Sequence, residues 1–207
     1  MKIQKKLVLT AVFVLLTMTI CSCRENEMSI SNDKNGNYTG FSDIPENYTA
    51  SNAADDGCLV IDTTQGLNEY GATITEKLET AGYENWQRFL EKVESGKDAF
   101  LRVAHFIDGI GYYHDLYYCD GKYTIFDFNE YGISKGTTFQ YLRRLDGYSG
   151  PASDPKADCY YVLTDSMILS YEDVQWSFFS SDLTNVTDIP FKWLGFMIYF
   201  ELCGGSI

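Results

Sequence analysis

Two histidines, His105 and His114, are the side chains of this sequence that could exchange a proton near neutral pH. The dipeptide Asp120-Gly121 separates two runs rich in aromatic and β-branched residues, and this pattern predicts a tight β-hairpin. In the register that the turn sets, His114 lies opposite Asp127. Because a carboxylate beside an imidazole can orient a general base, His114 and Asp127 are the candidate catalytic pair.

The sequence around this pair lacks the other parts of a nucleophilic site. No serine lies in a G-x-S-x-G context, and no cysteine shares the predicted strand face of His114. A structural cross-strand pair is therefore the favoured interpretation, and His105 is expected to be an ordinary sheet residue. A hydrolase that uses this pair, or two of the many carboxylates, is the alternative.

The folded part of the chain carries four cysteines, Cys58, Cys119, Cys159 and Cys203. An even number in an exported protein favours disulfides. Strand-end positions make pairs of Cys58 with Cys203 and of Cys119 with Cys159 conceivable, without preferring them. Free thiols are one alternative and zinc ligation is another, but the lack of a C-x-x-C spacing argues against a metal, and we predict none.

The absence of known binding motifs and the negative net charge argue against cofactor sites and nucleic-acid sites. No calcium loop, P-loop or dinucleotide fingerprint is present, so no cofactor is predicted. The 207 residues include 29 acidic and 16 basic ones, for a net charge of -13. Nucleic acid is not expected as a partner, because phosphate binding needs a patch of Lys and Arg.

The N-terminus is typical of an export signal. Three lysines in the first six residues precede residues 7–20, which are apolar apart from three threonines. Fourteen residues give about 21 Å of helix, less than the roughly 30 Å that a membrane-spanning helix must cross. A cleaved signal is therefore expected rather than a permanent transmembrane helix.

The end of this signal, Ile20-Cys21-Ser22-Cys23, resembles the bacterial lipobox. Cys23 is the predicted lipidated residue, because Cys21 would place the bulky Ile20 where the signal peptidase accepts small residues. The predicted location is the cell membrane, with the chain anchored through diacylglyceryl and palmitate-type acyl chains on the extracytoplasmic face. Cleavage after Ser22 removes three positive charges and leaves a net charge of -16.

Three regions are predicted along the chain. Residues 1–22 form the lipoprotein signal peptide, residues 23–57 form the lipidated cysteine and a disordered tether, and residues 58–207 form one globular domain. The tether is assigned because residues 24–57 are rich in Asn, Ser, Asp and Glu and show no hydrophobic period.

The predicted fold class is α+β, an antiparallel β-sheet with one packed amphipathic helix and a second helix near the C-terminus. The first helix is expected from Asn85, where apolar residues recur at helical spacing until Gly96. The second is expected from Ser170, which forms a capping box with Asp173. Strands are expected near 58–61, 99–106, 112–119, 122–129, 137–145, 160–164 and 191–202.

Several of these motifs together resemble a family of small Gram-positive surface lipoproteins, known as a domain of unknown function. They are Trp86-x-x-Phe89, Lys97-Asp98, Arg102-Val103-x-x-Phe106, the Gly109 turn, Asp115-Leu116-x-Tyr118-x-Asp120-Gly121-Lys122 and Asp127. The resemblance covers residues 84–165, although the turn lacks the proline of that family. It implies a surface location and an α+β fold, and it transfers no catalytic residue.

The expected function is that of a lipid-anchored domain that binds a glycan or protein ligand of the cell envelope. Tyr112, Tyr118 and Tyr123 are the candidate contact residues, because both faces of the predicted hairpin are aromatic and tyrosine combines contact area with a hydroxyl. A structural lipoprotein without a small ligand is a further alternative.

Overall fold

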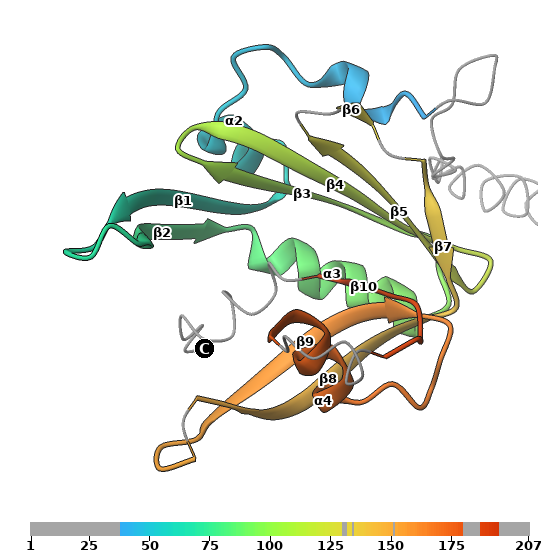
Figure 1. Cartoon of the computed structure of the whole chain (residues 1–207). Helices are drawn as coiled ribbons and strands as arrows, with labels where there is room; N and C mark the ends of the chain where they lie inside the picture. The colour runs from blue at the N-terminus through green and yellow to red at the C-terminus, as the bar shows by residue number, and fades with distance from the viewer. Residues whose placement is uncertain (1–37, 130–131, 134, 151, 180–186, 195–207) are drawn as a thin grey trace, which may run out of the picture.

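The computed structural model describes residues 38–129, 132–133, 135–150, 152–179 and 187–194 (Figure 1). In this part of the chain the strands form two sheets, and helices pack against both, so the predicted α+β class is confirmed. The predicted signal peptide, the lipidated Cys23 and the end of the last predicted strand lie outside the described residues.

Within the described residues, the large sheet has seven strands in the order β2-β1-β3-β4-β5-β6, with β7 paired to β5. Their bounds are β1 Leu59–Leu67, β2 Thr73–Ala81, β3 Ala99–Ile107, β4 Ile110–Cys119, β5 Lys122–Asn129, β6 Gly132–Ile133 and β7 Thr137–Phe139. All neighbours are antiparallel except β1 and β3. These two are parallel because helix α3, Tyr83–Glu94, carries the chain from β2 to the far side of β1.

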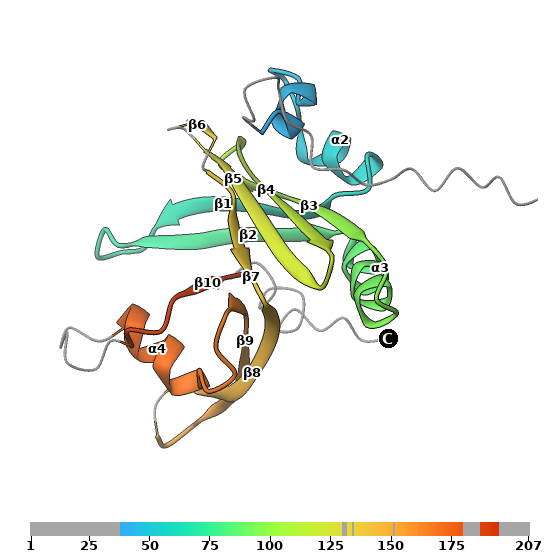
Figure 2. The ribbon, with the colours of Figure 1, turned by 90° about the vertical axis from the view of Figure 1, so that its right-hand side faces the viewer.

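A second sheet of three strands, β8 Tyr141–Ser149, β9 Lys156–Thr164 and β10 Phe191–Trp193, has the order β10-β9-β8. Figures 1 and 2 show this small sheet and α3 on one side of the large sheet. Helix α4, Tyr171–Phe179, packs on the small sheet, where Tyr171 and Val174 join Tyr160 and Val162 in a separate core cluster. The middle of β9 is therefore buried on both faces.

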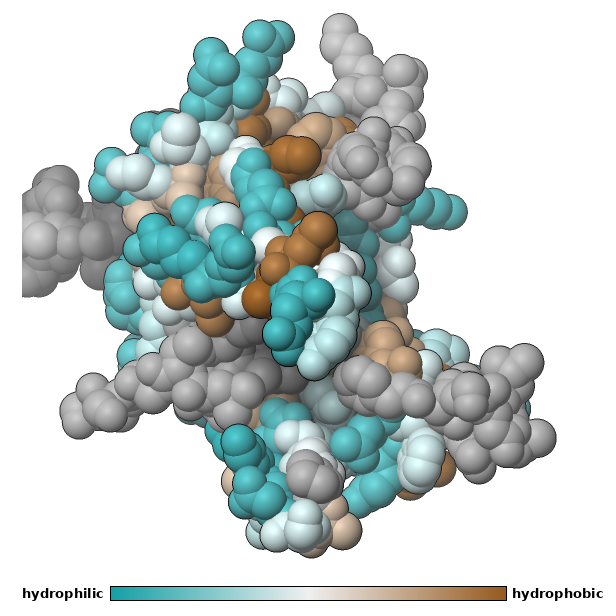
Figure 3. All heavy atoms as spheres, turned by 60° about the vertical axis from the view of Figure 1, so that its left-hand side comes forward, coloured by the Kyte–Doolittle hydropathy of each residue, from teal (hydrophilic) through white to brown (hydrophobic). Residues whose placement is uncertain are grey.

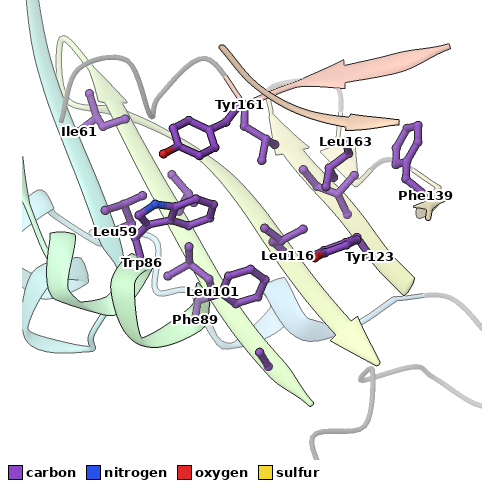
Figure 4. Packing of buried hydrophobic residues seen from close by; sticks show 14 of the residues in the cluster. Leu59, Ile61, Trp86, Phe89, Leu101, Leu116, Tyr123, Phe139, Tyr161 and Leu163 are labelled. Atoms are coloured by element: carbon purple, nitrogen blue, oxygen red, sulfur yellow. The ribbon is translucent and has the colours of Figure 1, made fainter. Parts of the chain in front are cut away.

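The main core lies between the two sheets and α3 (Figure 4). Trp86 and Phe89 of α3 stack with their rings 5.7 Å apart, and Trp86 meets Tyr161 of β9 edge to face at 5.4 Å. Leu101 and Leu116 complete this layer from the large sheet. The predicted apolar stripe of the helix is thus confirmed as a core face.

The opposite face of the large sheet is covered by residues 38–57. This N-terminal segment contains the 3-10 helix η1, Gly40–Asp43, and helix α2, Ala50–Asp55, which begins with a capping box between Thr49 and Asn52. Tyr38 and Phe41 are 6% and 4% exposed against β3, β4 and β5. The prediction of a tether up to residue 57 is therefore wrong for residues 38–57, which are part of the globular domain.

The predicted helix and hairpin agree closely with the structure. The helix begins at Tyr83, two residues before the expected Asn85, because Gly82 at φ 78° forms the N-cap. Gly96, at φ 68°, follows its end as predicted. The β4-β5 pairing has the predicted register, with Cys119 opposite Lys122 and His114 opposite Asp127.

The predicted strand 137–145 is wrong in its extent. The chain divides at Gln140 into β7, which joins the large sheet, and β8, which joins the small one. Asp146-Gly147, just beyond the predicted end, lies within β8 opposite Cys159 and Asp158. The turn falls instead beyond Gly150, which adopts φ 90°.

The end of the molecule where β1 and β2 project is covered mainly by hydrophilic side chains, with separate hydrophobic patches between them (Figure 3). Strand β2 forms this edge of the sheet and is largely exposed. Among the described residues, no helix has the length and apolar character needed to cross a membrane.

Candidate functional site

A cavity lies where the N-terminal segment, α3 and the strands β3 and β4 meet. Its volume is about 640 Å³. The N-terminal segment contributes Ile44, Tyr48 and Asp56 to its wall, and α3 contributes Asn85, Arg88, Phe89 and Lys92. The strands contribute Phe100, Arg102 and Tyr117. We call this space the α3 cavity.

Arg102 connects the strands to the N-terminal segment at the base of the cavity. Its guanidinium donates from Nε to Asp115 Oδ1 and from Nη2 to Asp115 Oδ2, both at 2.7 Å. It also donates to the backbone oxygen of Gly40 at 2.5 Å and to Asp43 Oδ1 at 3.0 Å. The two-contact geometry fits a planar guanidinium, and it fixes Gly40 and Asp43 relative to β3.

Asp115 is 0% exposed and also accepts a hydrogen bond from the hydroxyl of Tyr38. The Tyr38 hydroxyl lies 3.1 Å from that of Tyr117. Burial, and then the hydrogen bond to Asp115, raise the pKa of Tyr38 well above its usual value. Tyr38 is therefore a neutral donor that attaches the start of the segment to the sheet.

Two further cations lie on the cavity side of α3. Arg88 and Lys92 are four residues apart, so they project from the same helix face one turn apart, together with Asn85 and Phe89. Both side chains are exposed, and within the described residues neither forms a hydrogen bond or an ion pair. Asn85 is held in place by donating to the backbone oxygen of Cys58 at 3.3 Å.

Cys58 also borders the cavity, but its chemistry is not that of a nucleophile. The side chain is 3% exposed, and its sulfur lies 3.9 Å from the hydroxyl of Tyr48. Burial raises the pKa of the Cys58 thiol, which keeps it protonated at neutral pH. The Tyr48 hydroxyl donates to Asp56 at 2.7 Å, so this wall is fixed by internal contacts.

The predicted pair of His114 and Asp127 forms on the face of the large sheet that the small sheet covers. His114 Nδ1 lies 2.6 Å from Asp127 Oδ1, and Lys192 of β10 donates to Asp127 Oδ2 at 2.8 Å. Burial raises the pKa of Asp127, but hydrogen bonds and the charges of His114 and Lys192 outweigh this and lower it to about 2. Asp127 thus links the large sheet to the small one.

His105 is a neighbour of this pair and a sheet residue, as predicted. Its Nε2 lies 3.1 Å from the hydroxyl of Thr63 on β1. Burial, and then the nearby His114, lower the pKa of His105. The Thr63 hydroxyl is thus a hydrogen-bond partner of His105.

The expectation that Tyr112, Tyr118 and Tyr123 are exposed contact residues is wrong for Tyr118 and Tyr123. Tyr123 is 7% exposed, and its ring lies 5.0 Å from that of Tyr118 in the core between the two sheets. The reason is that the second sheet, absent from the predicted fold, covers this face. Tyr112 is partly exposed and lies opposite His105.

The pairing of Cys119 with Cys159, which the sequence made conceivable, is not formed in the structure. Cys58, Cys119 and Cys159 make no disulfide with one another. Cys159 lies in the core between the sheets, Cys119 lies at the β4-β5 turn, and Cys58 lies on the opposite face of the large sheet. Cys203 lies outside the described residues, so its conceivable pair with Cys58 stays untested.

No metal-binding group is present in the parts of the chain that the structure describes, since no three His, Cys, Asp or Glu side chains converge there. Comparison of the chain with models of known protein families, with curated proteins and with solved structures gives no match. The resemblance to a surface lipoprotein family therefore stays a prediction, and the cavity must be interpreted from its own residues.

Sequence reasoning missed the α3 cavity, although two signals for it were present. The Asp108-Gly109 turn fixes a register in which Arg102 lies opposite Asp115, as the structure shows. Arg88 and Lys92 follow the helical spacing used to identify α3. The packing of Tyr38 and Phe41, which completes the cavity wall, could not be predicted from neighbouring residues, because the residues that they contact on the sheet lie far along the chain.

Proposed function

We propose that this protein is a lipid-anchored extracytoplasmic binding domain that is attached through Cys23 and holds a small ligand in the α3 cavity. The attachment is supported by the lysines, apolar stretch and lipobox-like Ile20-Cys21-Ser22-Cys23 at the N-terminus. Ligand binding is supported by the cavity.

The observation that carries the binding proposal is the size and construction of this cavity. A volume of about 640 Å³ lies within the range of about 300 to 1,000 Å³ typical of small-molecule sites. Its polar groups are positioned by buried contacts, since Arg102 is fixed by Asp115 and Asn85 by the backbone of Cys58. A preformed wall reduces the entropy lost when a ligand binds.

The binding proposal is tested by changing Ile44, a half-buried side chain of the cavity wall. Wild-type protein and the Ile44→Trp variant are incubated with a small-molecule extract of the producing cells, and retained compounds are identified by mass spectrometry. We expect compounds that wild type retains and Ile44→Trp does not, because an indole occupies the cavity. Ile44→Ala, which enlarges the space, is the matched control and should retain them.

Identical retained compounds for wild type and a correctly folded Ile44→Trp variant would contradict the proposal. Near-ultraviolet circular dichroism of the three proteins establishes that each has the native packing.

The anchor is tested by growing cells with an alkyne-tagged palmitate and detecting the label on the protein. Cys23→Ser is expected to abolish labelling and release the protein from the membrane fraction. Cys21→Ser is the matched control and should keep the label, because Cys21 leaves with the signal peptide. Labelling of the Cys23→Ser variant would show that the anchor is placed wrongly.

A second candidate function, a cell-envelope hydrolase, is supported by the 2.6 Å contact of His114 with Asp127. This contact would fix the orientation of the imidazole of a general base. Hydrolysis of chromogenic esters and glycosides by wild type, lost in His114→Gln but kept in His105→Gln, would support it. Equal rates for all three proteins would eliminate this candidate.

A further inference from the structure

We infer that the ligand of the α3 cavity is a small organic anion, whose carboxylate or phosphate group binds between Arg88 and Lys92. This inference rests on the proposed binding function and specifies the chemical class of the ligand. It is argued from the hydrogen-bonding groups, the charges and the apolar surfaces of the wall.

Some hydrogen-bond donors of the cavity wall are bonded to protein acceptors, and others are not. Arg102 directs donors to Asp115, Asp43 and the backbone of Gly40, so the wall already satisfies most of them. Arg88 and Lys92 carry several donors each, and in the described part of the chain none of these has a protein acceptor. A ligand that enters from solvent therefore meets open donors, and it must supply acceptors.

The charges of the wall lead to the same conclusion. Arg102 is neutralised by Asp115 and Asp43, and these contacts lie within 3.0 Å. Asp56 accepts a hydrogen bond from Tyr48 at 2.7 Å. Arg88 and Lys92 are thus the charged side chains of the wall without a contact to a described residue, and they provide a local positive charge on a chain whose net charge is -13.

The spacing of the two cations favours one shared acid group. Like charges four residues apart on a helix repel and weaken it. Glu84 and Glu91 belong to the same helix, but among the described residues no carboxylate forms an ion pair with either cation. A carboxylate or phosphate bound between them would remove the repulsion and form charge-assisted hydrogen bonds with both side chains.

The rest of the ligand is expected to be apolar or aromatic. Phe89, Phe100 and Tyr117 face the cavity, and the rings of Phe100 and Tyr117 lie 4.8 Å apart. Such a surface binds an apolar body through buried area, and the cations determine its orientation. The site thus matches an amphiphilic anion rather than an inorganic ion.

A pair of fluorescent probes tests this inference. Anilinonaphthalene sulfonate has an aromatic body and an acid group, and N-phenylnaphthylamine has a similar body without the charge. Both are titrated into the chain from Arg24 onward, which contains every described residue and carries no lipid. We expect wild type to bind the sulfonate, and the double variant Arg88→Gln with Lys92→Gln to bind it about tenfold more weakly, because charge-assisted hydrogen bonds are lost.

The controls distinguish whether the site requires a charged ligand from whether a binding site exists at all. Lys122→Gln with Lys156→Gln removes the same charge away from the cavity and should leave sulfonate binding unchanged. Binding of the uncharged probe should be the same in wild type and in both double variants. If sulfonate binding survives Arg88→Gln with Lys92→Gln but is lost in Ile44→Trp, the anion inference is wrong and the cavity site stands.

If instead Ile44→Trp changes the binding of neither probe, no ligand site exists in the cavity. That outcome overturns the proposed binding function together with the inference.

Discussion

Arg102 and Asp115 lie opposite each other on β3 and β4, and their ion pair holds the N-terminal segment against the large sheet. The same guanidinium reaches the backbone of Gly40, 62 residues earlier in the chain. The register of a local hairpin thus brings Arg102 and Asp115 together. Their ion pair in turn holds the N-terminal segment, which forms one wall of the α3 cavity.

The ion pair is expected to be essential for stability. Asp115→Asn removes the fully buried carboxylate that pairs with Arg102 and leaves that guanidinium with the exposed Asp43 as its charged partner; breaking such an ion pair typically costs about 3 to 5 kcal/mol. Asp146→Asn is the matched control, because it breaks an exposed pair with Arg144 that is worth less than about 1 kcal/mol. Urea unfolding of the two variants measures the difference. Equal losses would mean that the buried pair has no special role.

Phe41 provides a test of whether the N-terminal segment belongs to the domain. Phe41→Ala removes a ring that is 4% exposed and is expected to lower the free energy of unfolding by about 3 kcal/mol or more. Tyr70→Ala, at a ring that is 85% exposed, should change it by less than about 0.5 kcal/mol. Thermal unfolding followed by circular dichroism measures both. An unchanged midpoint for Phe41→Ala would restore the tether interpretation.

Asp127 is expected to make folding sensitive to acid. Its pKa is lowered from 3.8 to about 2 in the folded protein, so the folded state is favoured where the carboxylate is ionised. This contribution, about 2 kcal/mol, is fully present above about pH 4 and is lost as the pH falls towards 2. The stability advantage of wild type over Asp127→Asn should therefore shrink over that interval.

Urea unfolding of both proteins between pH 2 and 6 measures this advantage. Asp154→Asn, at an exposed loop position, is the control and should differ from wild type by a small and constant amount. An advantage over Asp127→Asn that is constant with pH would mean that the contacts with His114 and Lys192 are not formed.

The thiols give a prediction about oxidation state. Cys58 and Cys119 should both be alkylated by iodoacetamide in denaturant without reductant, since neither forms a disulfide in the structure. In the folded protein Cys58 should react much more slowly than Cys119, because Cys58 is 3% exposed whereas Cys119 is partly exposed at the β4-β5 turn. Peptide mass spectrometry identifies the labelled residues. An unlabelled Cys58 in denaturant would mean that it is bonded to another cysteine.

The parts of the fold that were predictable depend on short-range chemistry. Asp108 and Asp120 each precede a glycine and adopt φ 50°, as tight hairpin turns require, and they set the registers of β3, β4 and β5. The capping box at Ser170 forms as expected, with the Asp173 backbone donating to the Ser170 hydroxyl at 3.1 Å. Each of these signals is contained within a few residues.

The parts that were missed depend on tertiary contacts. Strand β2 is exposed along both faces, so it shows no alternation of apolar and polar residues. Asp146-Gly147 has the composition of a turn, but pairing with β9 keeps it extended. Residues 38–57 are polar in composition, yet a few buried side chains and the contacts of Arg102 are sufficient to dock them.

The burial of Tyr38 also limits how far the proposed lipoprotein can stand from the bilayer. Fourteen residues separate Cys23 from Tyr38, and a fully extended chain of that length spans at most about 50 Å. A free segment up to residue 57 would have allowed more than twice that distance. In the proposed lipoprotein, the mouth of the cavity would accordingly stay in a thin layer next to the lipid headgroups.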